Sequence, residues 1–77
     1  LVAISTSGNS VNVLQAIKMA KLKKMKVIAF LGRKGGKCLG YSDVDIVVPS
    51  SSTARIQEMH ILIGHIICSL IEKILKL

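Results

Sequence analysis

Three short aliphatic runs, at residues 1–4, 26–31 and 44–48, limit the folds that this chain can adopt. Each run is apolar almost throughout and lacks the alternation of apolar and polar side chains that a half-exposed strand shows. Such runs are typical of strands covered on both faces in a parallel sheet. Helical patterns occupy residues 11–24 and about 54–75, so the predicted order is strand, helix, strand, strand, helix. This order favours an α/β fold with a parallel sheet and right-handed crossovers.

The two predicted helices differ in how much of their surface is apolar. The first carries a single apolar face, and its lysines gather towards the C-terminal end, where the helix dipole favours cations. The second is apolar on nearly every side, which indicates packing against more than one neighbour. Its apolar positions at helical spacing are Ile56, Met59, Ile63, Ile66, Ile67, Leu70 and Ile74. Three strands also leave at least one sheet edge unpaired, so we expect a further part of the domain or another subunit to cover it.

The composition narrows the class of partner. The net charge is +7, but the chain has one Tyr, one Phe and no Trp, so it offers no aromatic platform for single-stranded nucleic acid. We therefore expect a small anionic ligand rather than nucleic acid. The most apolar stretch, residues 59–71, is shorter than the roughly 20 residues that a membrane span needs, and we expect no membrane association. Cys38 and Cys68 form no CxxC pattern, which indicates free thiols in a reducing cytoplasm.

The chain opens directly in an apolar run at Leu1, and natural domains rarely begin inside a core strand. A chain of 77 residues also buries only roughly 60–65% of the surface that its unfolded state exposes. We therefore expect residues 1–77 to be one part of a single domain whose N-terminal part is absent.

A run of small polar residues, with the sequence STSGNS at residues 5–10, joins the first strand to the first helix. At such a turn, unpaired backbone N–H groups and the positive end of the helix dipole attract phosphate. Hydroxyl donors suit this chemistry, and so does a glycine, which lets a ligand approach the backbone. The alternative is that these residues only cap the helix. No GxGxxG or GxxxxGK[ST] motif is present, so nucleotide binding is not indicated. The candidate phosphate ligands are Ser5, Thr6, Ser7 and Ser10.

Residues 4–10, ISTSGNS, resemble the phosphosugar-binding loop of the sugar isomerase (SIS) domain superfamily. Residues 26–30 and 44–49 match the phosphoheptose isomerases of that superfamily in order and spacing. The last helix, with RIQEMHI at residues 55–61 followed by His65, resembles that family's C-terminal signature. The resemblance covers essentially the whole chain, and it implies the C-terminal portion of a three-layer α/β/α, flavodoxin-like SIS domain.

The resemblance implies an aldose–ketose isomerase that converts sedoheptulose 7-phosphate to D-glycero-D-manno-heptose 7-phosphate for lipopolysaccharide precursors. It also implies that His65 is a catalytic acid or base, that Gln57 contacts the sugar, and that both residues bind zinc. The family's other metal ligands have no counterpart in this chain, and Ala54 stands where some members carry Asp. We therefore expect this chain alone to bind zinc poorly and to be inactive.

The spacing between Gln57 and His65 sets a condition on a shared zinc site. Eight residues of straight helix rise about 12 Å, whereas zinc–ligand bonds are about 2 Å long. One ion would therefore draw the two side chains from different copies of the chain or from a bent helix. We expect an oligomer with active sites at subunit interfaces, and the family resemblance implies a homotetramer. His60 and His65 point about 140° apart on a helix, so they do not form a metal-binding pair.

Two other functions stay open. The first is a non-catalytic SIS module that binds phosphosugars, as in relatives that associate with the replication initiator or act in transcription regulators. The second is a nucleic-acid-binding protein, which rests on the net charge alone and would show a steep salt dependence of DNA binding.

Overall fold

The computed structural model describes residues 1–77 and contains one three-stranded parallel sheet. The strands β1 (Val2–Ser5), β2 (Ile28–Gly32) and β3 (Val44–Val48) lie in that order, with β2 in the centre. Ile4 lies opposite Phe30 in the register of β1 and β2. The sheet confirms the three predicted strands and the parallel α/β fold.

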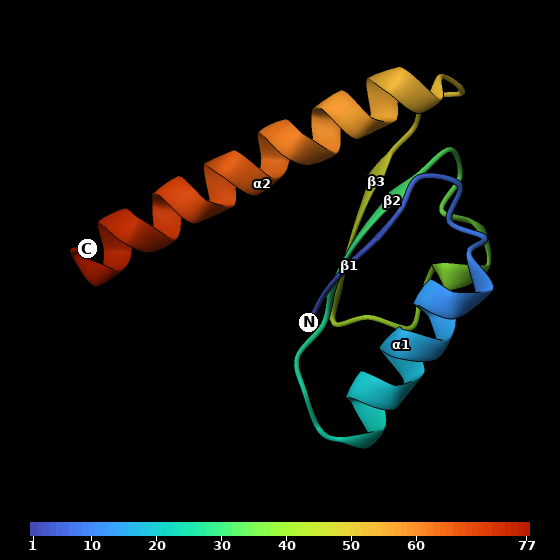
Figure 1. Ribbon diagram of the computed structural model, residues 1–77, viewed down its shortest axis with the longest axis horizontal. Helices are drawn as coiled ribbons and strands as arrows, with labels where there is room; N and C mark the ends of the chain where they lie inside the picture. The colour runs from blue at the N-terminus through green and yellow to red at the C-terminus, as the bar shows by residue number, and fades with distance from the viewer.

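Two helices pack on opposite sides of this sheet (Figure 1). Helix α1 (Val11–Leu22) connects β1 to β2, and helix α2 (Thr53–Leu75) follows β3. A loop that contains a short 3-10 helix, η1 (Gly36–Cys38), joins β2 to β3. The element order β-α-β-β-α and the α/β/α layers are those that the sequence predicts.

The helix bounds differ slightly from the predicted ones. Helix α1 ends at Leu22 rather than at residue 24, because Lys24 adopts a left-handed conformation with φ 60°. Helix α2 begins at Thr53, where the Ser52 hydroxyl accepts a hydrogen bond from the Arg55 backbone N–H at 3.4 Å. A serine hydroxyl is a common helix cap at this position. Although α2 has 23 residues, no helix of the structure is long and apolar enough to cross a membrane.

The face of the sheet towards α1 holds a closed hydrophobic core. Ile17 of α1 and Leu31 of β2 are fully buried there. Side chains alternate between the two faces along a strand, so Ala29 and Leu31 face α1 while Phe30 faces α2. The buried residues of this core are Ala3, Ile17, Ala20, Val27, Ala29, Leu31 and Cys38.

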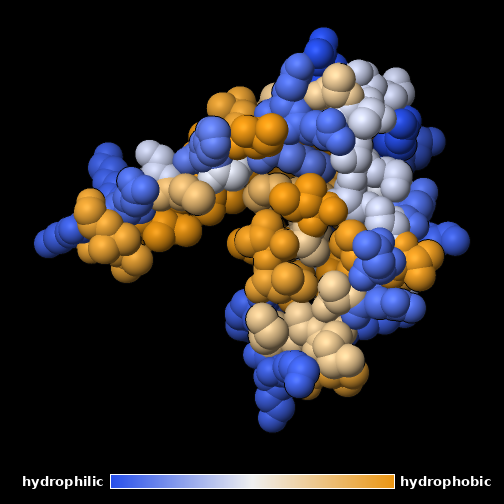
Figure 2. Space-filling model, viewed as in Figure 1, coloured by the Kyte–Doolittle hydropathy of each residue, from blue (hydrophilic) through white to orange (hydrophobic).

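The face towards α2 is covered only in part. Ile56 and His60 are the buried residues of α2, and both lie in its first half. Beyond them the helix extends away from the sheet, and Figure 2 shows apolar side chains along the open angle between the two. On β1, Val2 and Ile4 are 56% and 54% exposed. Ordinary soluble surfaces seldom leave such large apolar areas open, so this face needs further structure to cover it.

Candidate functional site

The polar loop at residues 5–10 is held in shape by two of its own hydroxyl groups. The hydroxyls of Ser5 and Ser10 lie 2.8 Å apart and share a hydrogen bond. The backbone N–H of Gly8 donates to the Ser5 hydroxyl at 3.1 Å, and Ser5 is only 3% exposed. These contacts give Ser5 and Ser10 a structural role in the loop, and their role as phosphate ligands stays a prediction.

Thr6 and Ser7 are half-buried, as Ser10 is. The Ser7 hydroxyl accepts a hydrogen bond from the Asn9 backbone N–H at 3.1 Å, so its own hydrogen stays free to donate. Ser10 occupies the cap position of α1, but its side chain makes no capping hydrogen bond, and the first turn has no acidic residue. The first backbone N–H groups of α1 therefore have no side-chain acceptor, which differs from the capping alternative. Hydroxyls and free helix N–H groups at one place can bind an anion.

A second loop, between β2 and β3, supports the polar loop. The Cys38 backbone N–H donates to the Gly8 carbonyl oxygen, and the Lys37 backbone N–H donates to Asn9 Oδ1, both at 2.8 Å. Gly8 has φ 73°, and a Cβ there would lie 2.1 Å from the Gly35 carbonyl oxygen, so only glycine fits. No sequence pattern assigns Asn9 this supporting role. The only local pattern near this contact is the pair of adjacent glycines in the second loop, which indicates a turn but not its partner.

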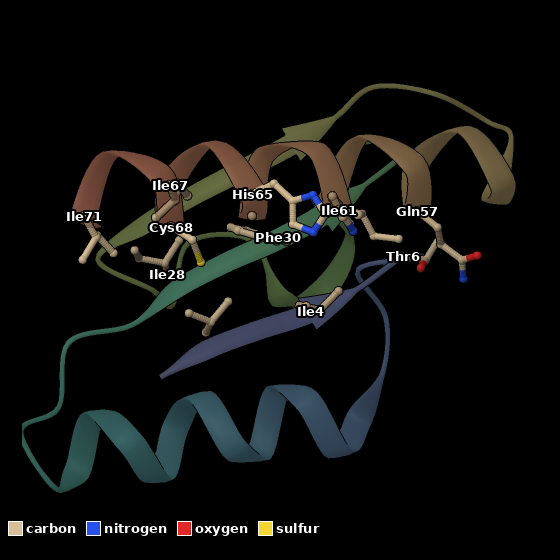
Figure 3. Close-up of a pocket in the computed structure, with 13 residues that line it drawn as sticks. Ile4, Thr6, Ile28, Phe30, Gln57, Ile61, His65, Ile67, Cys68 and Ile71 are labelled. Carbon is tan, nitrogen blue, oxygen red and sulfur yellow. The ribbon is translucent and has the colours of Figure 1, made fainter. Parts of the chain in front are cut away.

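Helix α2 and the sheet form the sides of a groove of about 630 Å³. Its walls are mostly apolar and come from β1, β2 and α2 (Figure 3). Three predicted site residues line it, namely Thr6 in the polar loop and Gln57 and His65 on α2. Thr6 and Gln57 lie at the same end of the groove, and His65 lies further along the helix. The structure therefore brings these three residues to one cavity, whereas the serines of the polar loop do not line it.

The two histidines of α2 have different surroundings. His60 is 4% exposed, and its Nε2 lies 2.7 Å from the Leu31 carbonyl oxygen. Its ring also packs against Phe30, with the ring centroids 5.7 Å apart. Both histidines line the groove, but His65 is exposed. No group of three or more His, Cys, Asp or Glu side chains could hold a metal ion, so Gln57 and His65 do not make a zinc site by themselves.

Two ionisable groups away from the groove have shifted pKa values. Asp43 accepts hydrogen bonds from Lys21 Nζ at 2.8 Å and from the Val27 backbone N–H at 2.7 Å. These contacts, that from Lys21 first, lower the pKa of the Asp43 carboxyl below its ordinary value. Burial, and then the charge of Asp45, raise the pKa of the Cys38 thiol. Cys38 is therefore a packing residue rather than a nucleophile.

Basic side chains surround the start of α2. The Arg33 guanidinium donates to the Ser51 carbonyl oxygen at 3.0 Å, which ties the loop after β2 to the segment before α2. Arg55 forms an ion pair with Glu58 at 2.6 Å. This carboxylate is therefore engaged with its neighbour and does not line the groove. The net charge of +7 favours an anionic ligand for the chain as a whole.

The chain is similar to phosphoheptose isomerases over nearly its whole length. It is 58% identical over 72 residues to the phosphoheptose isomerase of Leptospira biflexa, a match that covers 94% of this chain and 37% of that protein. The structure of the Francisella tularensis phosphoheptose isomerase matches with a TM-score of 0.90 and 42% identity, over 95% of this chain and 40% of that one. The structure of the Neisseria gonorrhoeae phosphoheptose isomerase matches with a TM-score of 0.87 and 54% identity, over 92% of this chain and 41% of that one.

These matches confirm the predicted resemblance to phosphoheptose isomerases and the predicted fold. No protein-family model matches the chain. The chain spans 37–41% of the length of these relatives. The groove between α2 and the sheet is therefore seen with less than half of the relatives' length in place.

Proposed function

We propose that this chain forms part of a phosphoheptose isomerase, which converts sedoheptulose 7-phosphate to D-glycero-D-manno-heptose 7-phosphate for lipopolysaccharide precursors. The observation that carries the proposal is that Thr6, Gln57 and His65 line one groove. Such a reaction needs a loop that binds phosphate, an amide that binds sugar hydroxyls and an imidazole that moves protons. The similarity to phosphoheptose isomerases in sequence and in structure supports the proposal.

The polar loop binds the phosphate group of the sugar in this proposal. The half-buried hydroxyls of Thr6 and Ser7 are its proposed donors, and the N-terminus of α1 adds backbone N–H groups that no side chain caps. The partial positive charge of the helix end favours the phosphate dianion. Ser5 and Ser10 hold the loop in shape and stay candidate ligands.

His65 is the proposed proton carrier. An aldose–ketose isomerisation moves a proton between neighbouring carbon atoms through an enediolate, so one group must first accept the proton and then return it. Histidine side chains generally suit this task near neutral pH, and His65 is exposed in the groove. The amide of Gln57 can both donate to and accept from sugar hydroxyls, which would orient the reacting carbons towards the imidazole.

Zinc enters the proposal only with ligands from elsewhere. Gln57 and His65 would supply two of its ligands, and the others would come from the rest of an isomerase chain or from another copy. Zinc bound there would polarise the sugar carbonyl. The apolar outer surface of α2 supports self-association, since Leu62, Ile66 and Leu70 are exposed.

We place the enzyme in the cytoplasm as a homotetramer with active sites between subunits. The two free cysteines suit a reducing compartment. An interface position for the groove would also supply the side chains that this chain lacks for a complete site.

A chimera tests the proposed activity, because the chain spans only part of its relatives. This chain replaces the matching segment of the Leptospira biflexa enzyme, and conversion of sedoheptulose 7-phosphate is measured. We expect kcat near that of the parent enzyme. His65→Asn should lower kcat by about 10²- to 10⁴-fold, the usual worth of a general acid or base.

Ser69→Ala is the matched control, since Ser69 lies on the same helix, is exposed and does not line the groove. It should leave kcat unchanged. A folded chimera that binds the sugar phosphate without converting it would contradict the enzymatic proposal and favour the non-catalytic SIS module.

A further inference from the structure

His60 forms the one hydrogen bond that joins a side chain of α2 to the backbone of the sheet. Its Nε2 lies 2.7 Å from the Leu31 carbonyl oxygen, 29 positions earlier in the sequence. A carbonyl oxygen only accepts hydrogen bonds, so Nε2 carries the hydrogen and donates it. The ring is 4% exposed and packs against Phe30, so water cannot easily replace the contact.

The hydrogen bond lies one turn of α2 after a second firm contact with the sheet. One turn earlier, Ile56 is fully buried, and a Cβ on Gly32 would lie 2.8 Å from the Ile56 side chain. Gly32 therefore allows the helix to come this close to β2. No side chain of α2 after His60 is buried, and the helix then leaves the sheet (Figure 1). His60 is thus the last buried residue of α2, and its ring forms part of the groove wall between Gln57 and His65.

The position of His60 links this attachment to the proposed site. With 3.6 residues per turn, His60 is about 60° around the helix from Gln57 and about 140° from His65. Holding His60 against the sheet therefore fixes the rotation of α2 and directs Gln57 and His65 into the groove, where Figure 3 shows both. If α2 turned about its axis, all three side chains would move together.

We propose that His60 is a positioning residue, whose hydrogen bond to Leu31 sets the rotation and height of α2 and so aims Gln57 and His65 at the substrate. This inference rests on the proposed isomerase function. The other ring nitrogen, Nδ1, is buried without a hydrogen-bond partner, and a buried polar atom without a partner lowers stability. A histidine at this place is therefore better explained by orientation of the helix than by stability alone.

Paired substitutions in the chimera test the inference. His60→Gln places an amide donor within reach of the Leu31 carbonyl oxygen, whereas His60→Met has similar bulk and no donor. We expect His60→Met to lower kcat by about 10- to 100-fold, the cost of a small misplacement of reacting groups. The KM for the sugar phosphate should change less than kcat, because the polar loop, which binds the phosphate in this proposal, is not part of α2. His60→Gln should restore most of kcat.

Wild-type kcat in His60→Met would overturn the inference, and so would an equal loss in both variants. Crystal structures of the chimera and the two variants give a second measurement that does not depend on turnover. His60→Met should show α2 rotated or shifted on β2, with His65 displaced from its place in the chimera, and His60→Gln should not. An unmoved α2 in His60→Met would refute the role of His60 even in a chimera without activity.

If His60→Met does not fold, the structure of His60→Gln tests the inference by itself. A displaced α2 in His60→Gln despite an intact hydrogen bond to Leu31 would then refute it.

Discussion

The two faces of the sheet differ in how much of their apolar surface this chain covers by itself. Against α1, Ile17 and Leu31 meet in a closed core and are fully buried. Against α2, Val2 and Ile4 remain more than half exposed, and a groove separates much of the helix from the strands. The residues proposed to act on the sugar lie along this open face. The closed face therefore stabilises the scaffold, and the open face carries the proposed site and leaves apolar side chains uncovered.

Leu31→Ala should give the largest loss of stability, because Leu31 is fully buried in the closed core. Truncation of a buried leucine costs about 2–5 kcal/mol, from lost burial and from the cavity left behind. Urea unfolding of the chimera measures the change. Leu22→Ala is a suitable control, since Leu22 is 78% exposed at the end of α1 and should cost little. Equal losses from the two variants would show that the closed core does not dominate stability.

Gly8→Ala should give the second-largest loss of stability. Gly8 lies in the polar loop, which leads into α1 on the closed face and contributes Thr6 to the groove on the open face. Gly8 has φ 73°, and a Cβ would lie 2.1 Å from the Gly35 carbonyl oxygen. We expect a loss of about 1–3 kcal/mol from backbone strain, together with weaker binding of the sugar phosphate by the chimera. Gly40→Ala separates strain from crowding, since Gly40 has φ 91° and nothing within 4 Å of its Cβ position. A phosphate affinity unchanged by Gly8→Ala would argue against the polar loop as the binding site.

Ile4→Val tests whether the open face is covered in a complete enzyme. Ile4 is 54% exposed in this chain, where loss of one methylene should matter little. In the chimera, we expect a loss of about 0.5–1.5 kcal/mol, as for a buried isoleucine. Urea unfolding measures the change in the free energy of unfolding. A loss well below 0.5 kcal/mol, which is about what a surface substitution costs, would mean that the face stays open.

Asp43→Asn should have the smallest effect, and one that depends on pH. Contacts from Lys21 and from the Val27 N–H lower the pKa of Asp43. A carboxyl with a lower pKa in the folded state stabilises the fold above its unfolded pKa, and the benefit disappears as the pH falls through the folded value. The wild-type chimera should thus be the more stable at pH 7, and the difference should begin to shrink at about pH 4, the ordinary pKa of Asp, and vanish once the pH is below the folded pKa of Asp43. Lys21→Met should reduce the same difference, and a gap that persists at low pH would contradict this assignment.

The sequence predicts the scaffold well because hydrophobic runs and helical spacing are local signals. The strand at 44–48 was predicted with its observed bounds, since Pro49 ends it. The strand predicted from residue 26 begins at Ile28, because Val27 instead bonds to Asp43, with its N–H donating to the carboxylate at 2.7 Å. Contacts between residues distant in the sequence change such bounds and leave no local pattern.

Sequence motifs named three residues that the fold brings together, but not the residues that hold them in place. Thr6, Gln57 and His65 were candidates from their motifs, and the fold brings them to one groove. Asn9 and His60 were not, because each depends on a partner 28 or 29 positions away in the sequence. The sequence also does not show which face of the sheet remains open. Along a strand of a parallel sheet, the side chains of both faces are apolar, so the two faces cannot be told apart by pattern.

A crystal structure of the His65→Asn chimera with sedoheptulose 7-phosphate tests the central claim most directly, because we expect this variant to bind the sugar and to convert it only slowly. We predict that the phosphate oxygens lie within hydrogen-bond distance of Thr6 and Ser7, and that the sugar chain runs along the groove past Gln57 to position 65. A sugar phosphate bound elsewhere, with the polar loop and the groove free, would contradict the account.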